Sequence, residues 1–186
     1  MIEELIRIDL ERSGAKVIVF SFEKDLILNK KSKVDFQRQV VLGFLRKELK
    51  NNELKIEHFD NGAPYLVGSD FHLSISHSHQ FYAIYLSAKS NIGIDVQCIK
   101  NNIKKGVHYF VNLEEQNTIE LTLENLHLIW SAKEAIYKMF KGEIEFYKDD
   151  ITINSIHQNQ LYVSCKNEKI QCKYRLEEKF SLVYSV

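Results

Sequence analysis

One short segment of the sequence carries side chains that could bind a divalent cation. In Gly93–Gln97 (GIDVQ), apolar residues alternate with Gly93, Asp95 and Gln97, a pattern typical of a half-buried β-strand. Asp95 and Gln97 then point to the same side, about 7 Å apart at their Cα atoms. The missing side chain of Gly93 would leave room for an ion and its waters, and a hard cation such as Mg²⁺ prefers oxygen ligands of this kind. The alternative is an ordinary solvent-facing aspartate at a strand end.

A second segment, Leu126–Lys141 (LHLIWSAKEAIYKMFK), has the composition of a helix that ends before Gly142. Its periodicity predicts two opposite stripes. The buried stripe consists of Ile129, Ala132, Ile136, Met139 and Phe140, and the other of Ser131, Glu134, Lys138 and Lys141. Glu134 and Lys138 lie one turn apart, so they could serve a site together or form an ordinary i,i+4 ion pair.

Two further segments, Leu73–Ser78 (LSISHS) and Phe81–Ser87 (FYAIYLS), also have the pattern of strands. With Gly93–Gln97 they predict three consecutive strands of one antiparallel sheet. A strand would place His77 and His79 on one face, which leaves open a metal-dependent hydrolase that uses His72, His77 and His79.

Four motifs together resemble those of the 4′-phosphopantetheinyl transferase superfamily. They are, in chain order, Asn61–Tyr65 (NGAPY), Leu73–Ser78 (LSISHS), Gly93–Val96 (GIDV) and Trp130–Lys138 (WSAKEAIYK). The first two are similar to motifs of the larger, Sfp-like (surfactin-synthetase-activating) group, whose members are pseudo-dimeric monomers.

The order of strands and helices indicates an α+β fold. The resemblance implies two similar α+β lobes related by a pseudo-twofold axis, residues 1–91 and 92–186, each an antiparallel sheet packed on a long helix. Phe81–Ser87 (FYAIYLS) and Phe180–Val186 (FSLVYSV) look like one element used twice, which favours the same arrangement.

The resemblance implies a reaction in which the 4′-phosphopantetheine arm of coenzyme A passes to a serine of an apo acyl or peptidyl carrier protein, with release of 3′,5′-ADP. Positioning and charge neutralisation dominate such chemistry. Asp95, Gln97 and Glu134 are the implied Mg²⁺ ligands, although Gln97 stands where many relatives carry glutamate. Which carrier protein and which biosynthetic pathway are served stays open.

The resemblance also implies contacts with coenzyme A. Lys138 would bind the diphosphate with help from Lys133, and the implied contacts of the nucleotide end are Lys30, Lys31, Arg38, Ser76 and His77. Glu134 and Lys138 are the implied catalytic residues, together with a general base for the incoming serine. Glu114 is the candidate for that base, with Glu115 as the alternative.

Two departures from the family pattern support a different class of function. Gln97 lacks the second charge of a carboxylate, and Ala63 stands where a basic residue is common between the glycine and the proline. A non-catalytic relative that binds coenzyme A or a carrier protein is therefore the alternative to an enzyme.

Composition sets further bounds. The 186 residues contain 25 Lys plus Arg and 25 Asp plus Glu, so no net charge attracts nucleic acid. We expect no secretory signal and no membrane contact, and therefore a cytoplasmic protein. The length of 186 residues suits a pseudo-dimeric monomer of the group that the motifs resemble. Local charge differs from the average, because Lys100, Lys104 and Lys105 precede the Tyr109–Phe110 pair and could dock an acidic carrier protein.

Overall fold

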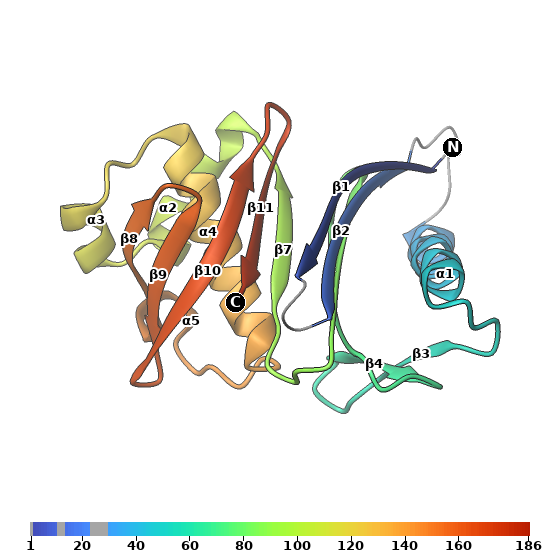
Figure 1. Ribbon diagram of the computed structural model, residues 1–186. Helices are drawn as coiled ribbons and strands as arrows, with labels where there is room; N and C mark the ends of the chain where they lie inside the picture. The colour runs from blue at the N-terminus through green and yellow to red at the C-terminus, as the bar shows by residue number, and fades with distance from the viewer. Residues whose placement is uncertain (1, 11–13, 23–29) are drawn as a thin grey trace.

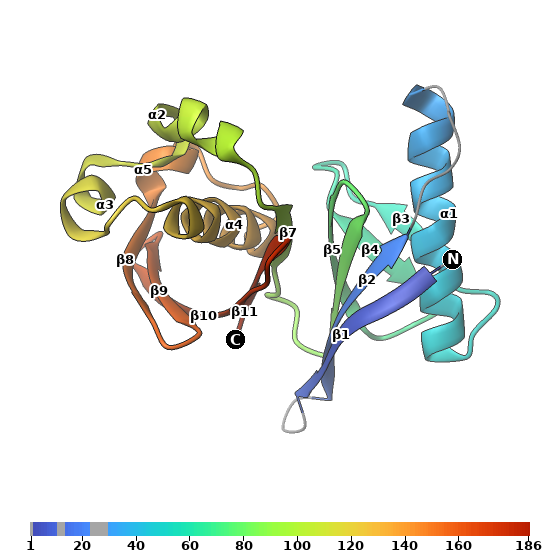
Figure 2. The same ribbon diagram turned by 90° about the horizontal axis from the view of Figure 1, so that it is seen from above.

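The computed structural model describes residues 2–10, 14–22 and 30–186, and these ranges form four layers (Figures 1 and 2). A helix, a sheet, a second sheet and a second helix follow one another across the molecule. All strand pairs are antiparallel, and the α+β class expected from the sequence is confirmed. No helix in the described ranges is long and apolar enough to cross a bilayer.

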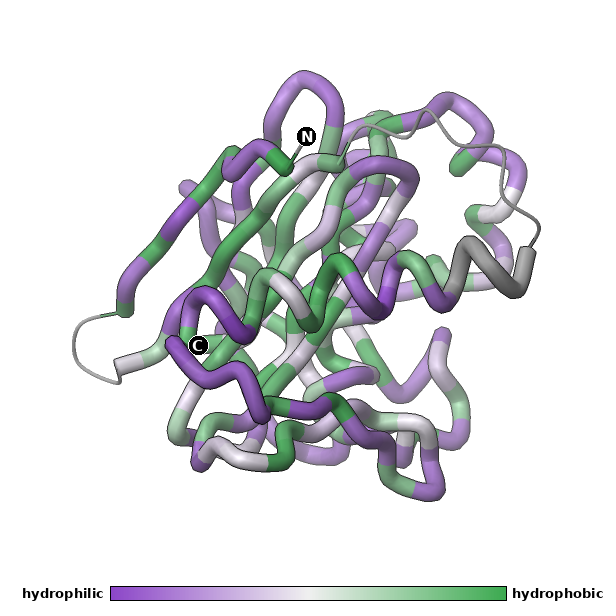
Figure 3. Tube along the Cα trace, turned by 90° about the vertical axis from the view of Figure 1, so that its right-hand side faces the viewer, coloured by the Kyte–Doolittle hydropathy of each residue, from purple (hydrophilic) through white to green (hydrophobic). Residues whose placement is uncertain are grey.

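The first sheet has the strand order β1-β2-β6-β5. Its strands are β1 (Ile2–Leu10), β2 (Ala15–Phe22), β5 (His72–Ser78) and β6 (Phe81–Ser87). Helix α1 (Lys30–Leu49) crosses its outer face, and apolar residues recur along this helix (Figure 3). Leu45 of α1 packs on Phe20 and Ile84 of the sheet. A separate hairpin, β3 (Lys55–His58) with β4 (Pro64–Val67), leads into β5.

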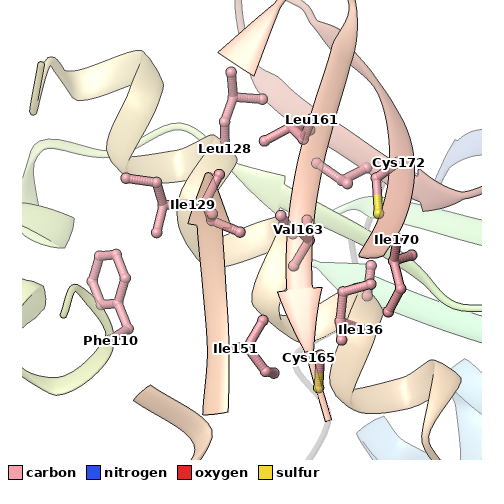
Figure 4. Close-up of a cluster of buried hydrophobic side chains, with 14 of the residues drawn as sticks. Phe110, Leu128, Ile129, Ile136, Ile151, Leu161, Val163, Cys165, Ile170 and Cys172 are labelled. Carbon is pink, nitrogen blue, oxygen red and sulfur yellow. The ribbon is translucent and has the colours of Figure 1, made fainter. Parts of the chain in front are cut away.

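The second sheet has the order β7-β11-β10-β9-β8. Its strands are β7 (Ile94–Cys98), β8 (Ile151–His157), β9 (Gln160–Cys165), β10 (Glu168–Leu176) and β11 (Phe180–Ser185). Helix α4 (Leu123–Met139) covers its outer face, where Ile129 and Ile136 pack among the strand residues (Figure 4). Four short helices surround α4: η1 (Asn101–Gly106), α2 (Val107–Phe110), α3 (Leu113–Thr118) and α5 (Tyr147–Asp150).

The predicted helix at Leu126–Lys141 is confirmed, with α4 beginning three residues earlier and ending two earlier. Its second stripe is less exposed than the pattern indicates. Ser131 is fully buried and its hydroxyl lies 3.1 Å from that of Ser181, because this side of α4 packs on strand β11 of the sheet.

The inner faces of the two sheets pack against each other. Side chains alternate along a strand, so Phe81 and Tyr85 of β6 face β11 while Ile84 faces α1. The ring centroids of Phe81 and Phe180 lie 4.7 Å apart, and those of Tyr85 and Tyr184 lie 6.0 Å apart. Aromatic side chains therefore bind the two sheets together.

The prediction that β5, β6 and β7 belong to one sheet is wrong. β5 pairs with β6, but β7 pairs with β11 in the second sheet. The other edge of β7 lies along β5, and serine hydroxyls replace a backbone ladder there. The amides of Ile94, Val96 and Cys98 donate to the hydroxyls of Ser74, Ser76 and Ser78, at 3.2, 3.1 and 3.0 Å. The two sheets thus meet along β5 and β7.

Candidate active site at the junction of the sheets

Gly93 brings the backbone of α4 against the start of β7. A β-carbon at this position would lie 1.8 Å from the Ala135 carbonyl oxygen, so no other residue fits without movement. The expectation that Gly93 leaves room for an ion is therefore wrong, since helix backbone fills that space. The close approach places the Glu134 and Lys138 side of α4 over Asp95.

Asp95 is buried at this junction, with 4% of its surface exposed. Its Oδ1 accepts hydrogen bonds from the Ser76 hydroxyl at 2.7 Å and from Lys138 Nζ at 2.8 Å. Lys138 Nζ also donates to the Ile94 carbonyl at 3.1 Å. Asp95 Oδ2 is buried and has no hydrogen-bond partner among the described residues. A buried acceptor without a donor costs free energy, so this oxygen suits a cation ligand.

Glu134 lies close enough to Asp95 for their charges to interact. Burial raises the pKa of Glu134, the Asp95 charge raises it further, and Lys138 acts in the opposite direction. Glu134 Oε1 accepts a hydrogen bond from the Tyr147 hydroxyl at 2.9 Å. Burial also raises the pKa of Tyr147, so this hydroxyl keeps its proton and is the donor. The structure thus brings together Asp95, Glu134 and Lys138, the grouping that the resemblance of their motifs implies.

Tyr147 is a site residue that the sequence does not reveal. It lies 13 residues after Glu134, in a four-residue helix of a segment without a helical or catalytic pattern. Gln97 occupies the expected position, half-buried on β7 and, by strand alternation, on the same face as Asp95.

Lys133 does not fit the expected contact with coenzyme A. Its side chain has no exposed surface, and its Nζ lies 3.0 Å from Glu115 Oε2, which is equally buried. The same Nζ donates to the Lys148 carbonyl at 2.6 Å. Burial lowers the pKa of Lys133 and raises that of Glu115, although each charge opposes the shift of the other. Lys133 projects to the covered side of α4 and serves as a structural ion pair there.

Glu115 likewise does not fit the alternative role as general base. It closes a capping box at the start of α3, where its Oε2 accepts from the Asn112 amide at 2.9 Å. Its Oε1 accepts from the Ile153 amide of β8 at 2.8 Å. Glu114 is exposed, and no described contact links it to Asp95. The assignment of Glu114 as base stays a prediction.

Ser76 and His77 lie on opposite faces of the first sheet. Strand alternation turns Ser76 toward Asp95, whereas the His77 ring lies 6.0 Å from that of Tyr82, which packs toward α1. The two side chains therefore cannot contact one phosphate from the same side. Arg38 is exposed on α1. The side chains of Lys30 and Lys31, in the first turn of α1, lie outside the described part of the structure.

The prediction that His77 and His79 share one face of a strand, as a metal-dependent hydrolase would need, is wrong. His79 lies beyond the end of β5, in the turn to β6, with a positive φ of 57°. There its ring contacts Lys100, so His77 and His79 do not share a strand face. In the described ranges, no three His, Cys, Asp or Glu side chains cluster as a metal site.

A cavity of about 560 Å³ borders the site at Lys138. It runs from the end of α4 to the loop of the NGAPY motif, and its lining includes four aromatic side chains: Phe59, Tyr65, Phe71 and Tyr137. Ala63 lines it without a charge, while Lys141 provides a second cation and lies 4.9 Å from the centroid of the Phe59 ring. Aromatic walls with two lysines suit a ligand that carries both a ring and anionic groups.

An exposed apolar surface lies on α2 and α3. Tyr109 and Leu113 are 72% and 76% exposed, and Lys104 and Lys105 are exposed just before them. Phe110 is buried in the core instead. Only the tyrosine of the Tyr109–Phe110 pair is thus available to a partner.

Comparison with known protein families gives a match to the second half of the chain. A family model described as ACPS, the 4′-phosphopantetheinyl transferase superfamily, matches residues 91–185. That range contains Asp95, Glu134 and Lys138. No curated protein matches the chain.

Proposed function

The chain belongs to the 4′-phosphopantetheinyl transferase superfamily, a family of phosphopantetheine-transferring enzymes, and we propose that it modifies an apo acyl or peptidyl carrier protein in a Mg²⁺-dependent reaction. In this reaction the carrier-protein serine attacks the β-phosphate of coenzyme A, the bond from that phosphorus to the leaving phosphate oxygen breaks, and 3′,5′-ADP departs.

The observation that carries this proposal is the environment of Asp95. Its Oδ2 is buried and without a hydrogen-bond donor among the described residues, while Glu134 and Lys138 lie beside it. Burial is the largest cause that raises the pKa of Glu134, and the neighbouring Asp95 charge raises it further, because two adjacent carboxylates repel each other. A divalent cation would relieve that repulsion.

Asp95 and Glu134 would hold Mg²⁺, and Gln97 could add an amide oxygen or hold a metal-bound water. When bound, the ion supplies positive charge that offsets the charge of the diphosphate. This donor set fits magnesium, because both anionic groups are hard carboxylate oxygens.

Lys138 would bind the diphosphate of coenzyme A. Its ammonium group is held by Asp95 Oδ1 and borders the cavity, so it can contact an anion there without leaving the carboxylate. The cavity offers space for the nucleotide end of the substrate. Lys141 can supply a second positive charge, which Ala63 does not.

We also propose that the chain is a pseudo-dimeric member of the Sfp-like group, with lobes at residues 1–91 and 92–186. The strands of the first sheet all precede residue 88, and those of the second all follow residue 93. Phe81 contacts Phe180 and Tyr85 contacts Tyr184, which are the matching positions of FYAIYLS and FSLVYSV. Equivalent residues of two repeats touch in this way near a twofold axis.

The direct test incubates the protein with Mg²⁺, coenzyme A and a panel of apo carrier proteins. A mass gain of one phosphopantetheine arm on a carrier protein, dependent on Mg²⁺ and lost with EDTA, is the expected result. Binding of coenzyme A without transfer to any carrier would instead support the non-catalytic alternative that Gln97 and Ala63 suggest.

A further inference from the structure

Among the described residues, Tyr147 is the hydrogen-bond partner of the Glu134 carboxylate. Its hydroxyl donates to Oε1 at 2.9 Å, and no second donor to Glu134 is found among the described residues. A glutamate side chain has several rotatable bonds, so a carboxylate without such a contact samples several positions. The hydrogen bond restricts Oε1 of Glu134, while Oε2 has no hydrogen bond to a described residue.

The Tyr147 ring is itself held in place. Its centroid lies 6.1 Å from that of Trp130 and 5.8 Å from that of Tyr137, both on α4. The carbonyl of the next residue, Lys148, accepts from the buried Lys133 at 2.6 Å. The Lys133–Glu115 pair therefore ties the backbone next to Tyr147 to α4, α3 and β8.

We propose that Tyr147 is a positioning residue that orients the Glu134 carboxylate beside Asp95 and so completes the cation site. The inference rests on the proposed function, because it concerns the same metal ligands. In this proposal the buried Lys133–Glu115 pair anchors α5, the helix that contains Tyr147. Residues that hydrogen-bond to a metal ligand commonly increase metal affinity by about 10-fold or more.

The hydrogen bond between Tyr147 and Glu134 can also act in the opposite direction and weaken cation binding. A hydroxyl that occupies a carboxylate oxygen can compete with a cation for Glu134, and its removal would then strengthen metal binding. A purely packing role for the ring would leave metal affinity unchanged when only the hydroxyl is lost. The sign of the change in affinity therefore separates positioning from the other two roles.

The test measures the Kd for Mn²⁺, as a paramagnetic substitute for Mg²⁺, by electron paramagnetic resonance of the free protein. Tyr147→Phe keeps the ring and removes only the hydroxyl, and we expect about 10-fold weaker binding. The matched control is Tyr162→Phe, which also removes one hydroxyl bonded to a side-chain oxygen, that of Gln160, but at an exposed position of strand β9. We expect unchanged affinity in this control.

A second measurement tests whether Tyr147 acts through Glu134. In a Glu134→Asp background the side chain is one methylene shorter, so its carboxylate no longer reaches the Tyr147 hydroxyl. Adding Tyr147→Phe should then change the Kd for Mn²⁺ by less than about 2-fold. A full additional 10-fold loss in that background would overturn the proposal. Unchanged or tighter Mn²⁺ binding by Tyr147→Phe alone, with the melting temperature preserved, would overturn it as well.

These outcomes are distinguishable from failure of the proposed function. If wild-type protein binds Mn²⁺ and modifies a carrier protein while Tyr147→Phe binds equally well, only the positioning role is wrong. If wild-type protein neither binds Mn²⁺ nor transfers the arm, the proposed function itself is wrong, and the role of Tyr147 with it.

Discussion

The carbonyl oxygen of Ala135 lies against the α-carbon of Gly93, so that a β-carbon at position 93 would come within 1.8 Å of it. This contact sets the distance between α4 and β7. Because Asp95 lies two residues after Gly93, and Glu134 and Lys138 flank Ala135 on the helix, the same contact determines how closely the site residues approach one another.

Gly93→Ala should therefore destabilise the protein by at least about 2 kcal/mol, because backbone atoms must move to admit the methyl group. Urea unfolding measures the effect. Gly43→Ala is the control, since a β-carbon at this exposed position of α1 meets nothing within 4 Å and alanine favours a helix by about 1 kcal/mol. Equal stabilities of the two variants would contradict the packing argument.

Asp95→Asn should lower the rate of phosphopantetheine transfer by about 100-fold or more. The amide oxygen can still accept from Ser76 and Lys138, so the fold should persist while one negative charge of the cation site is lost. Transfer rates at saturating coenzyme A, with melting curves as the control, check this outcome. Wild-type turnover in the variant would exclude Asp95 as a metal ligand.

Lys133→Met should destabilise the protein by about 3–5 kcal/mol, because it leaves the buried Glu115 charge without its partner. Adding Glu115→Gln removes that charge and keeps an acceptor for the Ile153 amide. The double variant should therefore lose less stability than the sum of the two single losses. Additive losses in a double-mutant cycle would show that the pair is not coupled.

Glu48 should contribute to acid stability. The hydrogen bond from Arg7 is the largest cause that lowers the pKa of Glu48 from 4.5 to about 2, and Lys16 adds to it. A carboxyl with a depressed pKa in the folded state adds stability above its unfolded pKa, and this stability disappears as the pH falls through the folded value. The stability difference between wild type and Glu48→Gln should thus be constant above pH 4.5 and shrink toward pH 2. A difference that stays constant down to pH 2 would contradict the assignment.

Charge reversal of Lys104 and Lys105 should raise the KM for an acidic carrier protein and leave that for coenzyme A nearly unchanged. Both lysines are exposed beside the apolar surface of Tyr109 and Leu113. Electrostatic docking weakens with salt, so the difference from wild type should decrease as ionic strength rises. Reversal of the exposed Lys47 and Lys169 on α1 and β10 is the control. An equal effect of the two double variants would place the docking surface elsewhere.

Local periodicity allowed the sequence alone to predict most elements. The 3.6-residue pattern around Glu134 and Lys138 identified α4 and put these two residues one turn apart, and alternation put Asp95 on a polar face of β7. The α+β class follows from such patterns, whereas the grouping of Asp95 with Glu134 and Lys138 is what the resemblance of their motifs to the transferase superfamily implies.

Tertiary structure alone decided which neighbours those elements have. Alternation cannot show that β7 pairs with β11 rather than with β6, because both partners satisfy the same pattern. Lys133 and Lys138 are equally polar in the sequence. Lys133 is nevertheless buried against Glu115, because short helices from elsewhere in the chain cover that side of α4, whereas Lys138 borders the cavity. Tyr147 reaches Glu134 only because α5 folds back onto α4. Contacts between distant segments depend on how whole layers pack, and no local repeat in the sequence encodes them.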